Sequence, residues 1–216
     1  MGKVFTDISI SLDGFVAGPN STLEEPLGEG GERLHDWVVK LETWKRRHGR
    51  EGGETNPDSD VVEEAVAATG ATVMGRNMFS GGFGTGPWEE DPNPDGWWGD
   101  DPPFKGPVFV ITHHPRETLE KQGGTSFTFV TDGIESAVEQ AKAAAGDKGV
   151  NVAGGAGVIQ EALAAGLLDE MQIHFAPLLL GGGTPFFTDG EPSRLEPVRV
   201  LASPAVTHMK YRVLKD

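Results

Sequence analysis

A cluster of glycines at residues 154–157 is the segment of this sequence with the clearest chemical character. It belongs to the run Val152-Ala153-Gly154-Gly155-Ala156-Gly157-Val158-Ile159, which lies between a β-rich run and a helical pattern. Glycines at such a junction let backbone N–H groups approach an anion closely, and the N-terminus of the following helix adds positive partial charge. The chemistry that this segment favours is the binding of a pyrophosphate.

The dinucleotide-binding fingerprint GxGxxG is nevertheless incomplete here. Gln160 stands where the third glycine would be, and no acidic residue ends a strand about 20 residues further on. On the glycines alone, a tight turn from strand to helix that binds nothing is the better interpretation.

Two other short β-rich runs end in residues that suit an anion. Gly75-Arg76 follows one of them, and Thr112-His113-His114 follows the other. Taken singly, Arg76 is better explained as a surface ion-pair residue and His113 as a turn residue. Because the carboxyl ends of parallel strands lie along one edge of a sheet, the three strand ends together predict a site for a phosphorylated nucleotide.

Several other motifs are incomplete. Residues 91–96 resemble the start of a calcium-binding loop, but its twelfth position is Pro102, which cannot supply the required carboxylate. The six histidines lack the paired helical spacing of a zinc protease, so we expect no metal site. The sequence also contains no GxSxG nucleophile motif and no GxxxxGK[ST] phosphate loop.

The elements that must position these residues alternate between strand and helix. Such alternation favours an α/β fold with a mostly parallel central sheet flanked by helices, followed by an antiparallel C-terminal hairpin. An Asp132/Glu135 capping box marks the start of one helix. The predicted strands are 3–12, 71–74, 108–112, 127–131, 150–153, 171–180 and the hairpin 198–202 with 205–214, and the other predicted helices are 33–47, 60–70 and 158–165.

The length of 216 residues predicts a single domain over 1–216. Its one compositional anomaly is 79–107, where Gly, Pro, acids and three tryptophans gather. Loops of this length are usually functional or disordered. We expect either a wall of a binding pocket or a decorated surface loop.

Composition narrows the class of partner. A formal net charge of -15 disfavours nucleic acid, since binding there depends on Lys and Arg. No run reaches the roughly 18 apolar residues of a membrane span, and no export signal is visible at the N-terminus. With no cysteine in the chain, we expect a cytoplasmic protein whose partner is a small molecule.

Five segments, taken in order, resemble the dihydrofolate reductase-like family, in the branch related to the C-terminal reductase domain of the bacterial riboflavin biosynthesis deaminase/reductase. They are SLDGFVAG (11–18), ATVMGRNMF (71–79), VFVITHHP (108–115), NVAGGAGVIQEAL (151–163) and LLDEMQIHFAPLLLGGGTPFF (167–187).

The resemblance implies a single reductase domain that binds NADPH at the edge of its sheet, and it suggests a homodimer. It implies that Ser9 and Val16 hold the nicotinamide carboxamide through their backbone, with Ala17 and Gly18 beside them. Arg76 and Asn77, after Gly75, would meet phosphates, and Thr112 and His113 would lie near the adenosine 2′-phosphate. The pyrophosphate would lie on Gly154, Gly155, Ala156, Gly157, Val158 and Ile159.

The substrate side is less specified. Riboflavin-branch reductases usually carry a cation after SLDG, basic residues before the segment that here reads ATVMG, and an acid before the glycine pair. This chain has Phe15, Val62-Glu63-Glu64 and Ala153 instead, so a phosphoribosyl substrate is disfavoured. Folate-reducing members use a carboxylate on the first long helix. Asp36, beside Trp37, or Glu32 could act in that way, but taken alone either residue is better explained as a solvent-facing acid.

We therefore expect an NADPH-dependent reductase of a C=N or C=O bond in a small heterocycle resembling a pterin or a pyrimidine. Its candidate catalytic residue is Asp36. The alternatives are 5-amino-6-(5-phosphoribosylamino)uracil reductase of riboflavin biosynthesis and a nucleotide-binding relative without turnover. The candidate substrate-binding residues are Asp13, Trp37, Trp97 and Trp98.

Overall fold

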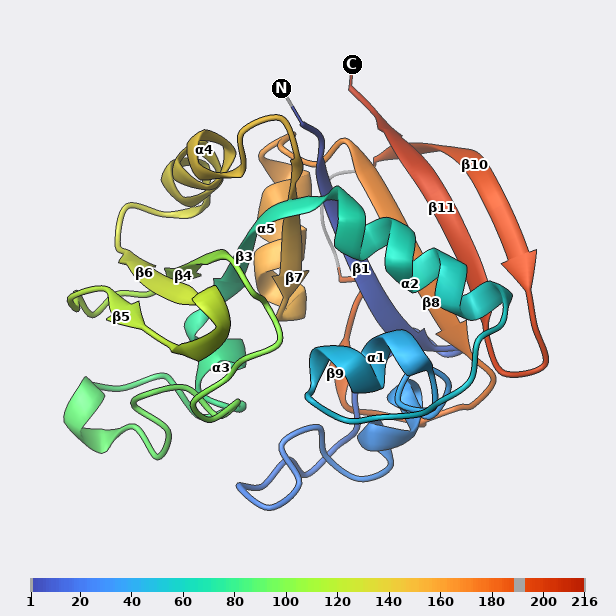
Figure 1. Ribbon diagram of the computed structural model, residues 1–216, viewed down its shortest axis with the longest axis horizontal. Helices are drawn as coiled ribbons and strands as arrows, with labels where there is room; N and C mark the ends of the chain where they lie inside the picture. The colour runs from blue at the N-terminus through green and yellow to red at the C-terminus, as the bar shows by residue number, and fades with distance from the viewer. Residues whose placement is uncertain (1, 189–192, 216) are drawn as a thin grey trace. The chain divides into compact units, whose positions relative to one another are not determined.

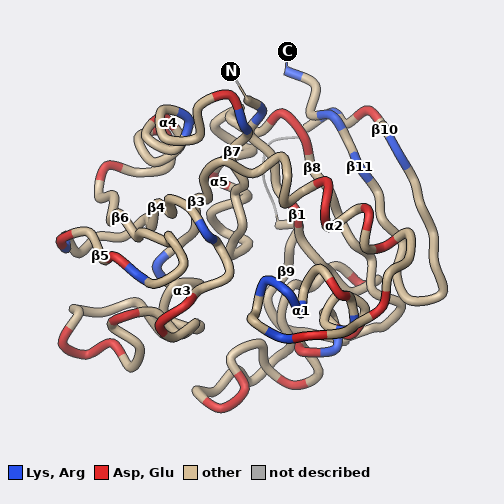
Figure 2. The backbone as a smooth tube through the Cα atoms, viewed as in Figure 1, with Lys and Arg blue, Asp and Glu red and all other residues tan. Residues whose placement is uncertain are grey.

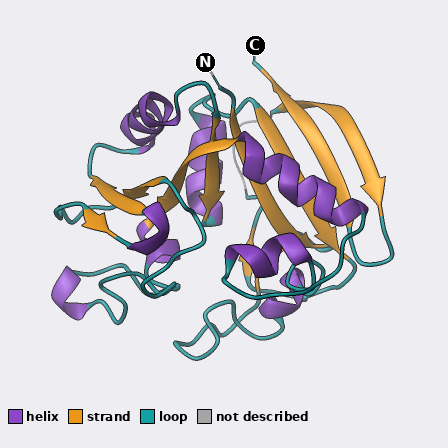
Figure 3. Cartoon of the chain, viewed as in Figure 1, coloured by secondary structure: helices purple, strands orange, loops and turns teal. Residues whose placement is uncertain are grey.

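Strands and helices alternate along residues 2–188 and 193–215, the part of the chain that the computed structural model describes (Figures 1 and 3). The strands form a mostly parallel central sheet, with antiparallel strands at the C-terminal end, so the predicted α/β class is confirmed. Contacts along the chain divide it into two compact units, residues 1–6 with 69–169 and residues 7–68 with 170–216. The single domain expected from the length stays a prediction.

In the first unit, four parallel strands adjoin the start of β1 (Val4–Ser11) in the order β7, β3, β4, β6. A two-residue antiparallel strand, β5, ends this row. Each of the expected strands is present, with bounds within a few residues of those predicted. The bounds are β3 Thr69–Gly75, β4 Pro107–Ile111, β5 Leu119–Glu120, β6 Ser126–Val130 and β7 Gly149–Gly154.

The longest helix of this unit begins differently from the prediction. Helix α4 (Ile134–Ala145) follows Gly133, whose φ of 89° turns the chain, and no side chain caps the helix. The Asp132/Glu135 capping box is therefore wrong, although the predicted apolar face of α4 is buried. The other helical segments are α3 (Arg76–Phe79), α5 (Ala156–Ala164) and the short 3-10 turns Trp88–Glu90 and Gln122–Gly124.

The second unit contains the rest of β1, followed in the sheet order by β8 (Glu170–Ala176), β11 (Thr207–Leu214) and β10 (Arg194–Ala202). The predicted C-terminal hairpin of β10 and β11 is confirmed. Strand β8 ends four residues before the expected Leu180. Leu180 and Gly181 instead donate backbone hydrogen bonds to the Asp13 carboxylate, at 3.1 and 2.7 Å, which holds this segment as a loop.

The predicted helix over 33–47 is two shorter pieces, a 3-10 turn at Gly31–His35 and α1 at Glu42–Arg47. Leu41 between them is extended (φ -71°, ψ 144°), and Glu42 exchanges the helical hydrogen bond for one to the carbonyl of Glu54 at 2.9 Å. The expected apolar side chains still lie inward, since Leu34, Trp37 and Leu41 are buried.

Helix α2 (Pro57–Ala68) begins three residues before the predicted start at residue 60. The reason is Asn56, whose side-chain oxygen accepts hydrogen bonds from the backbone N–H groups of Asp58 and Ser59, at 3.0 and 3.2 Å. Figure 1 shows α2 lying across β8 and β11. None of the helices in the described residues is long and apolar enough to cross a bilayer.

The segment after α3 is irregular, and one buried ion pair anchors it. Arg76 is 6% exposed, and its Nε donates to Asp91 Oδ2 at 2.9 Å and to Ser80 Oγ at 3.1 Å. Its Nη2 also donates to Asp91. The guanidinium carbon lies 3.2 Å from the centroid of the Trp88 ring, a cation–π arrangement. Arg76 is thus an ion-pair residue, but a buried one.

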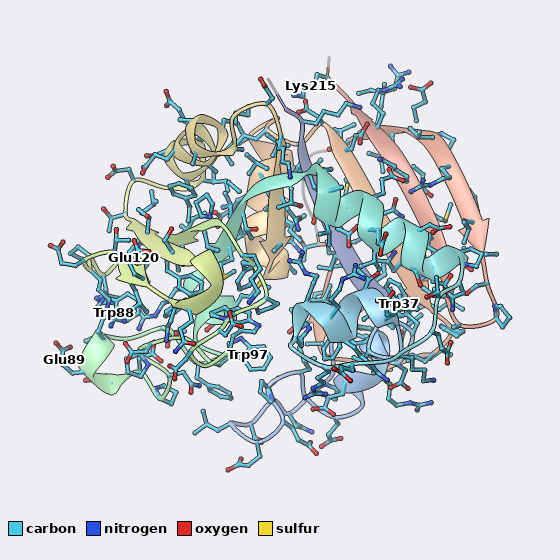
Figure 4. The ribbon with its side chains drawn as sticks, viewed as in Figure 1. Trp37, Trp88, Glu89, Trp97, Glu120 and Lys215 are labelled. Carbon is cyan, nitrogen blue, oxygen red and sulfur yellow. The ribbon has the colours of Figure 1, made fainter. Side chains whose placement is uncertain are left out.

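Aromatic packing closes the same segment against the sheet. Phe79 and Phe127 are fully buried and contact each other edge to face, with ring centroids 5.0 Å apart. Trp88, labelled in Figure 4, packs on Phe79 and Phe129 from the loop side. The tryptophans of 79–107 therefore give this long loop a packed core of its own.

Replacing Asp91 tests the anchor. Asp91→Ala leaves the buried Arg76 charge without its partner, so we expect a loss of about 3–5 kcal/mol in the free energy of unfolding. The matched control is Asp95→Ala on the same loop, whose side chain is 65% exposed in its pair with Arg116 and should cost at most about 1 kcal/mol. Urea unfolding of both variants gives the comparison, and equal losses would show that the buried pair does not anchor the loop.

The same pair predicts an acid sensitivity. Burial raises the pKa of Asp91, but hydrogen bonds from Ser80, Arg76 and the Asn93 backbone outweigh burial and lower the pKa below its ordinary value. Stability from Asp91 is then present above the unfolded-state pKa of about 3.9 and is lost as the pH falls through the lower folded-state value.

Candidate functional site

The carboxyl ends of three neighbouring strands of the first unit lie side by side. In the parallel register, Met74 of β3 is opposite Gly154 of β7, and Gly75 is opposite Ile111 of β4. Thr112, which follows β4, extends the row by donating its N–H to the Val130 carbonyl at 3.0 Å. The structure therefore brings together the three strand ends that the sequence singled out.

The glycine run forms the turn from β7 into α5. Gly154 has a φ of 138°, which favours glycine, and the Gly154–Gly155 peptide is cis. A Cβ on Gly75 would lie 2.9 Å from a methyl of Val158, so glycine at 75 lets the end of β3 approach the start of α5.

Gly155 and Gly157 have a different reason to be glycine. Both are exposed, and a Cβ on either would meet no protein atom within 4 Å. Packing within the chain therefore does not require glycine at these positions. Gly155 precedes the first turn of α5, where the N–H groups of a helix lack intrahelical partners. Open space, free donors and the positive end of the helix are the features of an anion cradle.

The other predicted residues near these strand ends differ in their exposure and in whether their side chains are already hydrogen-bonded. Asn77 and His113 are exposed, whereas Thr112 is buried and its hydroxyl accepts a hydrogen bond from the His114 N–H at 3.1 Å. Arg76 follows Gly75 as expected, but Asp91 and Ser80 occupy its guanidinium. That engagement weakens Arg76 as a phosphate ligand, and its Nη1 atom has no partner among the described residues.

In the second unit, Ser9 and Trp37 are linked directly. Trp37 Nε1 donates to Ser9 Oγ at 3.1 Å, and both side chains are buried. The Ser9 hydroxyl is thus engaged within the protein, and the backbone contact that the resemblance implies for Ser9 stays a prediction. Trp37 is part of a buried apolar cluster with Leu41 and Val206.

Val16 and Ala17 lie in a short strand that the sequence did not indicate, β2 (Phe15–Ala17), paired with β9 (Thr184–Pro185). Gly18 is buried because the following loop packs against it: a Cβ there would lie 2.0 Å from the Glu29 carbonyl oxygen. Its N–H donates to the Leu27 carbonyl at 2.7 Å. Packing within the protein is therefore enough to explain why position 18 is a glycine.

The three acids that the sequence offered in this unit, Asp13, Glu32 and Asp36, are all exposed, but the surroundings of Asp13 and Asp36 differ. Asp13 holds the loop after β8, and a hydrogen bond from Ser11 is the main cause that keeps its pKa below the ordinary value. Asp36 directly follows the 3-10 turn at Gly31–His35.

Of the two remaining candidates, Trp97 is 44% exposed and Trp98 is partly buried. Their ring centroids are 5.1 Å apart, and Trp98 also packs edge to face on Phe104. Figure 4 labels Trp97 on the loop that carries it. Their assignment to a substrate stays a prediction.

A hydrogen-bonded chain of four titratable side chains in the second unit was not predicted from the sequence; three of the four are buried, and the Asp7 side chain is 22% exposed. Asp7 Oδ1 lies 2.9 Å from His174 Nε2, His174 Nδ1 lies 2.6 Å from His208 Nδ1, and His208 Nε2 lies 3.1 Å from Asp58 Oδ1. The histidines face each other because residues 174 and 208 are paired across β8 and β11. Strand patterns reveal each histidine but not which strand is its partner.

No group of three or more His, Asp or Glu in the described parts of the chain has an arrangement that could hold a metal ion. Charge is unevenly distributed, as Figure 2 shows. Acidic residues line the loop after α3, and Lys and Arg occur on β10 and β11.

The sequence profile of the RibD C-terminal domain matches residues 2–209. No curated protein matches the chain significantly. Among solved structures, a riboflavin biosynthesis protein described as putative, from Shewanella sp. PV-4, is 22% identical with a TM-score of 0.65, and 99% of each chain is covered. A pyrimidine reductase-like protein from Corynebacterium diphtheriae is 15% identical with a TM-score of 0.51, covering 100% of this chain and 93% of its own.

A third similar structure is the diaminohydroxyphosphoribosylaminopyrimidine deaminase/5-amino-6-(5-phosphoribosylamino)uracil reductase of Thermotoga maritima, at 16% identity and a TM-score of 0.54. The match covers 99% of this chain but 57% of that one. These structural likenesses bear on the fold, and the profile match bears on the family. Because it extends over nearly the whole sequence, the chain belongs to the RibD C-terminal domain family.

Proposed function

We propose that this protein is an NADPH-dependent reductase that delivers hydride to a C=N or C=O bond of a small heterocyclic substrate. Membership of a reductase family supports an oxidoreductase of the riboflavin biosynthesis type. The observation that carries the cofactor is the open, glycine-lined start of α5 beside the ends of β3 and β4.

In this proposal the first unit holds the phosphates. The N–H groups at the start of α5, from Gly155 to Gly157, bind the pyrophosphate, and the glycines at 155 and 157 leave room for it. The Val158 N–H is already engaged, because it donates to the Gly155 carbonyl at 3.1 Å. Thr112 and His113 lie near the 2′-phosphate, and Asn77 contributes an exposed amide from α3, which follows β3. For Arg76 the backbone N–H is the better donor, because Asp91 neutralises its guanidinium.

In the second unit, the backbone of Ser9 and Val16 is proposed to orient the nicotinamide carboxamide, with Ala17 and Gly18 beside it. The bound cofactor supplies the hydride, and the protein supplies orientation, exclusion of water and electrostatic stabilisation. Asp13, Trp37, Trp97 and Trp98 are the candidate substrate contacts, and Asp36 is the carboxylate that the resemblance suggests for catalysis.

The substrate class distinguishes this proposal from its closest alternative, reduction of 5-amino-6-(5-phosphoribosylamino)uracil. That activity is part of the printed name of the Thermotoga maritima protein. Against it, α2 carries Glu63 and Glu64 where basic residues are usual, and both glutamates are engaged within the protein. Glu63 pairs with Arg46, and Glu64 pairs with Arg199 and Lys210. An uncharged heterocycle fits these residues better than a phosphoribosyl group.

Ligand-induced stabilisation tests the cofactor. NADPH at 100 times its dissociation constant should add about 2.7 kcal/mol to the free energy of unfolding and raise the melting temperature. Loss of NADPH absorbance with a panel of pterins, pyrimidines and the phosphoribosylaminouracil then separates an enzyme from a nucleotide-binding relative without turnover. The cofactor proposal fails if neither NADPH nor NADP⁺ shifts the melting temperature at millimolar concentration.

A side chain at position 157 tests the cradle itself. Gly157→Val adds atoms where no protein atom lies within 4 Å, so the fold should tolerate it, but it occupies the space proposed for the pyrophosphate. We expect NADPH affinity to fall at least about tenfold, equivalent to roughly 1.4 kcal/mol, with little change in melting temperature.

The matched control is Ala164→Val, at the exposed opposite end of the same helix. It should leave the affinity for NADPH unchanged. Equal affinities in Gly157→Val and wild type, measured by fluorescence titration, would remove the pyrophosphate from this turn.

The homodimer that the resemblance suggests has a candidate surface in β10. This strand ends the sheet order, and its Val198 and Val200 are 47% and 60% exposed. Val200→Lys should shift a dimer towards monomer in light scattering, whereas Thr131→Lys, at an exposed position directly after β6 in the other unit, should not. A wild-type monomer at high concentration would rule out the dimer.

A further inference from the structure

Asp7, His174, His208 and Asp58 form a hydrogen-bonded chain of side chains, and its contacts fix the number of hydrogens that it contains. Its three contacts, at 2.9, 2.6 and 3.1 Å, are hydrogen bonds, and each needs one hydrogen between its two heavy atoms. Two neutral imidazoles and two carboxylates bring only two hydrogens. The four side chains therefore hold one proton more than two neutral imidazoles and two carboxylates would. Their net charge is minus one instead of minus two.

The surroundings make it difficult for this proton to leave without a change in structure. His174 and His208 are 2% and 1% exposed, and Trp37 covers both rings, with centroids 4.8 and 5.0 Å away. If the proton left, one of the three contacts would lose its hydrogen, and a buried polar atom would become unpaired at a cost. Ser203 satisfies the far end by donating to Asp58 Oδ2 at 3.0 Å.

A second proton is disfavoured as well. Burial is the main cause that lowers the pKa of His208, the charge on His174 lowers it further, and Asp58 and Asp7 only partly compensate. His35, from the 3-10 turn before Trp37, faces the same group, and burial followed by His174 lowers its pKa too. Further along the same face of β8 and β11, Lys210 pairs with Glu170 and Glu64 and so is already neutralised.

The two aspartates at the ends of the hydrogen-bonded chain differ in how many of their carboxylate oxygens are bonded. Asp58 has both carboxylate oxygens bonded, to His208 and to Ser203. Asp7 has only Oδ1 bonded, and its buried Oδ2 has no partner among the described residues. Asp7 also lies two residues before Ser9 on β1, so their side chains share one face of the strand, and Ser9 is bonded to the Trp37 that covers the histidines.

We propose that Asp7, His174, His208 and Asp58 form a shared-proton site that supplies the proton for the reduction, discharged through Asp7. This role rests on the proposed reductase function. When the substrate carbon gains hydride, its nitrogen or oxygen gains the proton, the chain passes from one to two net negative charges, and water later returns a proton. Asp7 thereby takes the place of the exposed Asp36 as the proposed source.

The proton count can be measured without any substrate. In ¹⁵N-labelled protein at neutral pH, the ring nitrogens of His174 and His208 should show three attached hydrogens in total, one of them shared between the two Nδ1 atoms. Two hydrogens, as in a pair of neutral rings, or four, as in two imidazolium ions, would overturn the shared-proton site.

Stability provides a second readout. The unfolded histidines titrate independently near pH 6.5, so together they carry two extra protons below that pH and none above it. The folded pair carries one extra proton across the pH range of this titration. The pair's contribution to stability should peak near pH 6.5, and the unfolding equilibrium constant should rise towards tenfold per pH unit on either side. Subtracting the profile of the double variant His174→Gln/His208→Gln isolates this peak. A monotonic difference would contradict the count, and the NMR measurement on wild type decides if the variant does not fold.

Donation is tested with Asp7→Asn, which keeps the size of the side chain but cannot relay a proton as a carboxylic acid. On the panel compound for which wild type oxidises NADPH, kcat should fall at least about tenfold and lose its decline at high pH, while NADPH affinity is retained. The control is His48→Gln. The His48 ring stacks on Trp44 and is not part of the shared-proton site, so this variant should behave as wild type. A wild-type kcat and pH profile in Asp7→Asn would overturn donation. If no compound is reduced, the reductase function fails and donation with it, while the NMR result still decides the shared proton.

Discussion

The parallel register of β7, β3 and β4 is the constraint on which the proposed cofactor chemistry depends. Because Gly154 is opposite Met74 and Gly75 is opposite Ile111, three strands end at the same level. The chain must turn after each of them, and two of the turns lead into helices. A shift of this register would separate the glycine turn from Thr112 and remove the convergence of backbone donors that an anion requires.

Buried charge is the second organising feature, and a different set of residues compensates it in each unit. In the first unit, Asp91 neutralises Arg76 and ties the long loop to the end of β3. In the second unit, two aspartates enclose a histidine pair. Removing one partner from either arrangement leaves an uncompensated charge in a dry environment, which is far more costly than losing an exposed ion pair. Both arrangements therefore fix their surroundings, whatever their chemical role.

Local patterns in the sequence predicted the strands and the strand-end residues because apolar alternation and glycine placement act over a few residues. Helix 33–47 was wrong for a non-local reason, since Glu42 and Glu54 meet through the backbone and interrupt it at Leu41. The partner of Arg76 lies 15 residues away in a loop without periodicity, and no local signal marks it. The histidine pair depends on which strands neighbour each other, information that an isolated β pattern does not contain.

The central claim is that backbone N–H groups at the start of α5 receive the phosphates of NADPH. Amide chemical shifts of the assigned protein, followed while NADPH is added, test it most directly. The account predicts that the largest changes fall on Gly155, Ala156 and Gly157, because the proposed anion hydrogen bonds act on those N–H groups. Binding that leaves these amides unchanged, with the largest shifts elsewhere, would contradict it.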